Sequence, residues 1–135
     1  MLPVGGAGDA VLNAKGQELP LLDATVLEDL ANELGGPEIA QKFAQDYAGM
    51  WSQRQRRLME SVEREDRTAA LDAVISLKVS SAMIGGSRLS HLAGRLEAIL
   101  RAGDLREGAT LLALMAIHGH DTAEEVQLRY GRIRA

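Results

Sequence analysis

The 135-residue chain contains no cysteine and only 3% aromatic residues. Without cysteine, disulfides, cysteine nucleophiles and thiolate metal ligands are all excluded. A core that is poor in aromatic residues and rich in Leu, Ala, Ile and Met favours packed helices over a sheet. The few aromatic side chains are Phe43, Tyr47, Trp51 and Tyr130. The first three step by four residues, which indicates one helix face in the core rather than a platform that stacks nucleic-acid bases.

The chain also lacks an excess of positive charge and any long apolar run. Its formal net charge is −4, which argues against non-specific nucleic-acid binding, since such binding depends on a basic surface. No apolar run approaches the roughly 18 residues that span a membrane, and no signal peptide is visible. Hydrophobic residues make up 46% and charged residues 25%, as in an ordinary globular domain. We therefore expect a cytoplasmic protein that binds neither nucleic acid nor a membrane.

The N-terminal residues differ from the rest of the chain. Residues 1–18 contain four glycines and one proline without a sustained hydrophobic period. Such a composition is typical of a mobile segment. We predict a flexible leader over 1–18 and a single folded domain over 19–135.

From residue 19 onward, apolar residues recur at spacings of three and four, which predicts helices. The expected segments are 22–34, about 38–64, a third from Asp66 or Thr68 to about 84, a fourth from Ser87, a fifth over 105–116 and a short last helix from Asp121–Thr122. Glycine-rich breaks of two to four residues favour antiparallel neighbours. The predicted fold is all-α: an up-and-down antiparallel four-helix bundle with an additional N-terminal helix lying across it and a short C-terminal helix.

The most specific motif is the stretch 74–97, VISLKVSSAMIGGSRLSHLAGRLE. It resembles the histidine-containing phosphotransfer (HPt) domain of bacterial phosphorelays, in which a helix reads approximately H-x-L-K-G-S-S-x-x-x-G-A and a Leu-rich helix ending in L-E follows. Leu77-Lys78, Ser80-Ser81, Gly85 and Leu96-Glu97 fall at matching offsets. The resemblance implies the HPt bundle and a role in two-component signalling, with a response-regulator receiver domain or a histidine kinase as partner.

The decisive family position departs from the pattern. The phosphoacceptor histidine of the family aligns with Ile75, which has no nucleophilic nitrogen. The glycine that follows the family's lysine aligns with Val79, one helical turn beyond Ile75 on the same face. The resemblance thus implies partner binding without phosphotransfer at this position.

A helical wheel gives an independent view of the same helix. At 100° per residue, the apolar stripe that includes Val74 and Leu77 lies roughly 140° from Ile75, so position 75 is predicted to be exposed. The predicted partner-binding surface consists of Leu71, Ile75, Lys78, Val79 and Ala82. The alternatives are that another helix, the leader or a second copy in a homodimer covers it, and that Lys78 is a plain solvated lysine.

The three histidines leave a second functional hypothesis open. His91 borders the apolar stripe of the next helix, and active phosphotransfer through it is the alternative to a silent module. His118 and His120 lie near acidic residues, but this pattern is more typical of a turn with capping charges than of a metal site. We expect no metal, no cofactor and no enzyme activity. A dimerisation or scaffold module outside phosphorelays is the third hypothesis.

A basic run precedes the motif helix. Arg54, Arg56 and Arg57 are followed by acidic residues such as Glu60 at helical spacing. This pattern predicts a solvated helix face with weak ion pairs.

Overall fold

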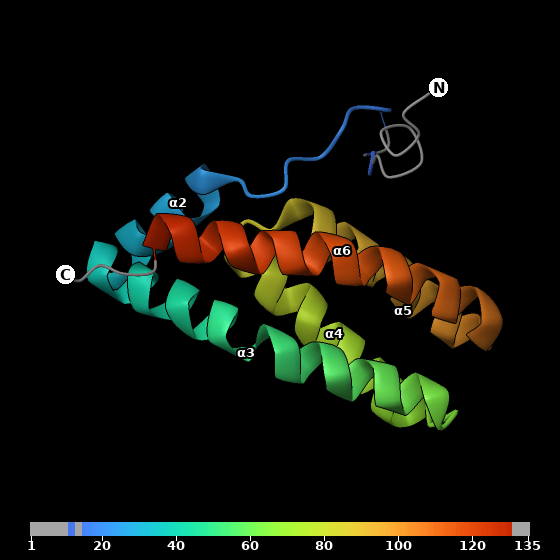
Figure 1. Cartoon of the computed structure of the whole chain (residues 1–135). Coiled ribbons are helices and arrows are strands. Elements are labelled where there is room, and N and C mark those ends of the chain that lie inside the picture. The colour runs from blue at the N-terminus through green and yellow to red at the C-terminus, as the bar shows by residue number, and fades with distance from the viewer. Residues whose placement is uncertain (1–10, 13–14, 131–135) are drawn as a thin grey trace.

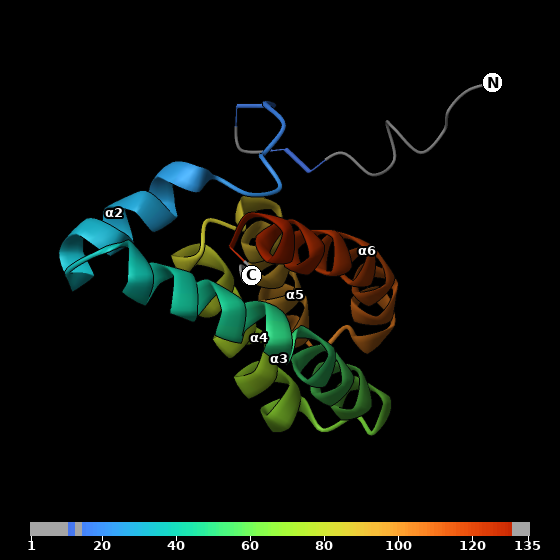
Figure 2. The same ribbon diagram turned by 60° about the vertical axis from the view of Figure 1, so that its left-hand side comes forward.

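The protein is a bundle of helices, described here from a computed structural model that covers residues 11–12 and 15–130. The helices are α2 (Ala24–Leu34), α3 (Pro37–Glu63), α4 (Arg67–Met83), α5 (Ser87–Ala102) and α6 (Leu105–Tyr130). Helices α3 to α6 run up and down beside one another (Figure 1). Figures 1 and 2 show α2 at one end of the bundle, beside the first turns of α3. The predicted four-helix bundle with an additional N-terminal helix is confirmed.

The helices begin and end at the signals that the sequence carries. The Asp23 and Asp66 side chains accept hydrogen bonds from backbone N–H groups in the first turns of α2 and α4. Pro37 opens α3, where its missing N–H costs nothing. The fourth helix, predicted from Ser87, begins at that residue as α5, and Gly86 takes the cap position without a side-chain hydrogen bond. Short local signals thus set the lengths of the helices.

The separate C-terminal helix predicted from Asp121–Thr122 does not exist, because α6 continues through that point to Tyr130. The Thr122 hydroxyl is fully buried and donates a 2.6 Å hydrogen bond to the carbonyl of His118, as it does inside a helix. Gly119 does not mark a turn either. A Cβ at this position would overlap the indole ring of Trp51 on α3. The glycine therefore lets α3 and α6 approach closely.

Two hydrophobic clusters fill the bundle. The main cluster lies between α3, α4, α5 and α6 and includes the fully buried Leu92 and Leu96. The second cluster, which contains Leu27, Tyr47 and Val126, joins α2 to one end of the bundle. On α4, Val79 and Met83 remain exposed.

Part of the segment predicted to be a flexible leader belongs to the core. Val11 is 2% exposed and packs in the main cluster. Its carbonyl accepts a 2.8 Å hydrogen bond from the N–H of Leu19, and Arg88 on α5 forms a 3.2 Å ion pair with Glu18. The boundary at residue 18 stays a prediction, and Val11 and Glu18 on its N-terminal side both contact the bundle. Residues 1–10 and 13–14 lie outside the described residues.

Candidate functional site

The HPt-like motif occupies α4 and the first turns of α5. The inward stripe expected for α4 is observed, since Ala70, Val74, Leu77 and Ser81 are all buried. The turn that follows depends on Gly85, whose φ of 83° lies in the left-handed region. The Gly85 carbonyl accepts a 2.7 Å hydrogen bond from the N–H of Asp23, so the turn also holds the start of α2. Several residues of the motif therefore have roles in the fold that do not depend on phosphotransfer.

Ile75 is half-buried, although the wheel predicted it to be exposed. Ile75 and Leu71 both pack against the edge of the main hydrophobic cluster. A wheel gives only the direction of Cβ, and a long apolar side chain extends from there along the helix surface towards its neighbours. The family's acceptor position thus carries a partly covered aliphatic side chain.

The remaining apolar positions of the predicted surface face outward. Val79 is 51% exposed and Ala82 is also exposed. Met83, which the sequence reasoning missed, is 42% exposed one turn beyond Val79. The i, i+4 spacing from Val79 was the signal that could have found it. Together with the half-buried Ile75, these side chains form an apolar strip along the outside of α4.

Lys78 is held by a carboxylate on the neighbouring helix rather than solvated alone. Its Nζ lies 2.6 Å from Oε1 of Glu97, whose other oxygen accepts hydrogen bonds of 2.8 and 3.1 Å from Arg101. The hydrogen bonds from Lys78 and Arg101 hold the pKa of Glu97 below its usual range. The motif contains Glu97 but does not predict its contact with Lys78, which follows from the pairing of α4 with α5. The Lys78 ammonium is therefore already paired with a carboxylate of its own chain.

The two serines of the motif tie α4 to α3. The Ser81 hydroxyl lies 2.7 Å from the Tyr47 hydroxyl in the buried interior. Burial raises the pKa of Tyr47 to about 12, against the smaller opposing effects of the Ser81 hydrogen bond and the Arg54 charge. The Ser80 hydroxyl accepts a 2.8 Å hydrogen bond from Arg54. Both hydroxyls act in helix packing here.

The three histidines lie on helices other than α4. His91 is half-buried on α5, while His118 is buried and His120 is exposed on the continuous helix α6. Within the described part of the chain, no group of His, Asp and Glu side chains is arranged to hold a metal ion. None of the described helices is both long enough and apolar enough to cross a membrane. No described histidine therefore occupies α4.

The comparison with solved structures identifies a close likeness in fold. The chain superposes on a crystal structure of histidine-containing phosphotransfer protein B (HptB) from Pseudomonas aeruginosa PAO1 with a TM-score of 0.76 and 22% sequence identity. The match covers 85% of this chain and 98% of that protein. No protein-family model and no curated protein matches the sequence. The chain therefore has the helical-bundle fold of a histidine-containing phosphotransfer protein.

Proposed function

We propose that this chain is an HPt-like signalling module that binds a receiver domain or a histidine kinase in the cytoplasm without carrying a phosphoryl group itself. The likeness in fold to HptB supports the proposed role in phosphorelay signalling. The observation that carries the silent part is Ile75 at the motif position where the family has its acceptor histidine. An aliphatic side chain offers no lone pair to attack a phosphoryl group.

The charge beside Ile75 supports the same view. In the family, the lysine of the motif lies near the phosphohistidine and helps to balance its charge. Here Glu97 holds the Lys78 ammonium at 2.6 Å. A phosphoryl group near Lys78 would have to compete with that carboxylate for the same donor.

The partner surface in this proposal is the predicted set of Leu71, Ile75, Lys78, Val79 and Ala82, extended by Met83. Exposed apolar side chains that lie together on one helix are typical of a protein-binding surface. Methionine suits such a surface because its flexible thioether adapts to the shape of a partner. The apolar strip beside one paired lysine favours docking by packing rather than by charge.

A labelling experiment tests the silent part. Receiver domains carrying radioactive phosphate are incubated with the wild type, with Ile75→His and with the double variant Ile75→His/Val79→Gly. We expect no acid-labile label on the wild type and label on at least the double variant, in which the imidazole and the space around it are both restored. Label on the wild-type chain would refute the silent module. Its loss in His91→Gln would then identify His91 as the acceptor.

A capture experiment tests the surface. Val79 on α4 and Ile117 on α6 have nearly equal exposed fractions, 51% and 52%, so Val79→Asp and Ile117→Asp form a matched pair. We expect Val79→Asp to weaken capture of the partner receiver by about tenfold or more, because it places a charge in an apolar contact. Ile117→Asp should leave capture unchanged, and both variants should retain the helical circular dichroism of the wild type. Equal capture by both variants would refute this surface, and a dimer by light scattering that Val79→Asp dissociates would indicate a homodimer instead.

A further inference from the structure

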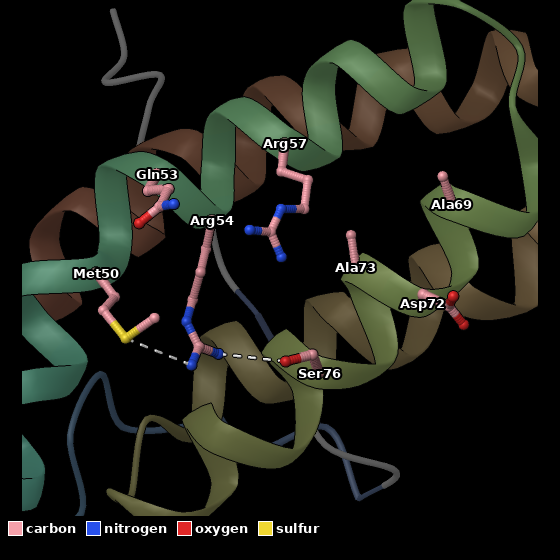
Figure 3. Close-up of a pocket in the computed structure, with 8 residues that line it drawn as sticks. All are labelled: Met50, Gln53, Arg54, Arg57, Ala69, Asp72, Ala73 and Ser76. Carbon is pink, nitrogen blue, oxygen red and sulfur yellow. Dashed lines mark hydrogen bonds between the residues drawn. The ribbon is translucent and has the colours of Figure 1, made fainter.

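A pocket of about 310 Å³ opens between α3 and α4. Its lining includes Met50, Arg54 and Arg57 from α3 and Asp72 and Ser76 from α4 (Figure 3). The volume lies at the small end of the range for ligand pockets, roughly 300–1,000 Å³. This pocket lies outside the predicted partner surface, which includes none of these residues.

Arg54 is held in place at this pocket by neutral groups. One terminal nitrogen donates to the Ser80 hydroxyl at 2.8 Å and to the Ser76 hydroxyl at 3.4 Å, and the other lies 3.9 Å from the Met50 sulfur. Its Nε is buried and has no hydrogen-bond partner in the described structure. Hydroxyls and a thioether orient the guanidinium but do not neutralise its charge. The cation is therefore both pre-positioned and electrostatically unbalanced.

A second guanidinium adds to this charge. The ion pairs expected for the basic run from helical spacing do not form: among the described residues, neither Arg54 nor Arg57 lies within ion-pair distance of a carboxylate. In Figure 3 the Arg54 and Arg57 side chains both extend into the space between the helices, whereas the Asp72 carboxylate points away from them. Two uncompensated cations thus share one pocket.

We propose that this pocket binds a small anion that carries a carboxylate or a phosphate group. Planar guanidinium groups recognise both anions by paired N–H···O hydrogen bonds. The Ala69 and Ala73 methyl groups also line the pocket and would contact an apolar part of such a molecule. A guanidinium that is already oriented loses less conformational entropy when it binds. The inference is independent of the partner surface on α4 and of the silence of Ile75.

The test is a titration of the full chain at constant ionic strength, in which amide NMR spectra are recorded at each point. Inorganic phosphate and succinate are titrated separately, and this distinguishes phosphate from carboxylate as the preferred group. We expect saturable shifts at the pocket residues with at least one of the two anions. Arg57→Gln should weaken that binding by about fivefold or more, because it removes a charged hydrogen-bond donor.

Arg56→Gln is the matched control. Arg56 is an exposed arginine beside Arg57 that does not line the pocket, so its removal changes the net charge equally. The affinity of this variant for the anion should stay within about twofold of the wild type, since salt screens the charge of an exposed side chain outside the pocket. The absence of saturable shifts with both anions, or an equal loss in Arg56→Gln and Arg57→Gln, would overturn the proposal.

Discussion

Helix α3 meets two neighbours in opposite ways. Towards α6 it closes completely, because Gly119 has no side chain and the Trp51 ring occupies that space. Towards α4 it also packs in the main cluster, but beside that buried contact it leaves a pocket, where the hydroxyls of Ser76 and Ser80 meet the Arg54 guanidinium. The first contact is apolar, and Trp51 within it is only 6% exposed. The pocket side of the second contact is polar and open.

The difference indicates that one side of α3 mainly contributes to stability and that the pocket beside α4 is available for binding. A close-packed apolar contact has no room for a ligand, and a change of one methyl group there alters the free energy of unfolding. A polar contact around a pocket tolerates changes better, because its groups are partly hydrated and add less net stability. We therefore expect substitutions on the α6 side to lower the free energy of unfolding and those in the pocket to change what the protein binds.

The largest effect is expected for Gly119→Ala. The added methyl group would overlap the Trp51 ring, so α3 and α6 must separate or the ring must leave its place. We expect a loss of at least about 2 kcal/mol in the free energy of unfolding, measured by urea denaturation. Because Trp51 is the one tryptophan of the chain, its fluorescence reports directly on this contact.

Gly49 supplies the matched control on α3. A Cβ at Gly49 would meet no atom within 4 Å, so Gly49→Ala should stabilise the helix by about 0.5–1 kcal/mol. The smaller ring of Trp51→Phe should restore part of the stability of Gly119→Ala, with a coupling free energy of about 1 kcal/mol or more. If Gly119→Ala were as stable as the wild type, the contact between α3 and α6 would not be closed.

Tyr47 gives an intermediate effect that depends on pH. Burial raises its pKa to about 12 from 10.0, so the folded protein holds the phenolic proton more tightly than the unfolded chain. The stabilisation is complete below pH 10 and is lost as the pH rises from about 10 to 12, by up to about 2 kcal/mol. Urea denaturation at pH 8 to 11.5 measures this decline.

Two variants isolate the contribution of Tyr47. Tyr47→Phe should be less stable than the wild type by about 1 kcal/mol at pH 8, because the buried Ser81 hydroxyl loses its partner. It should also show a flatter decline at high pH. Tyr130→Phe leaves Tyr47 in place and should keep the wild-type decline. A decline of the same steepness in Tyr47→Phe would show that other groups cause it.

The sequence predicted the architecture because the signals for it are local. Periodic leucines and the breaks at Gly35–Pro37 and Gly85–Ser87 depend on neighbouring residues only, and the four-helix bundle followed from them. The residues His118–Thr122 have the composition of a turn, and the prediction of a break there was wrong. In the structure that segment is helical and lies against Trp51, which is far away in the sequence. A single-sequence pattern does not contain such a contact.

The partner surface on α4 stays a prediction, and the sequence supplied only the register of its residues along one helix. The motif register identified Ile75 and Lys78, since their spacing along one helix is fixed. The Lys78–Glu97 pair depends on how α4 and α5 align, and the pocket depends on the directions of the Arg54 and Arg57 side chains. The basic run was therefore predicted to be a solvated face, whereas two of its members line a pocket.

The smallest effect is expected between α4 and α5, where the Lys78–Glu97 ion pair lies partly exposed at the surface. Hydrogen bonds from Lys78 and Arg101 lower the pKa of Glu97, so the stability that this carboxylate adds is present above its unfolded pKa and is lost as the pH falls through its folded pKa. Glu97→Gln should therefore lower the melting temperature slightly at pH 7 and converge with the wild type as the pH falls through the lowered pKa of Glu97. Glu60→Gln, which removes an exposed carboxylate without an ion pair in the described structure, should show no such convergence. A constant difference between Glu97→Gln and wild type at every pH would mean that Glu97 acts by packing, and that the Lys78 charge remains available to a partner.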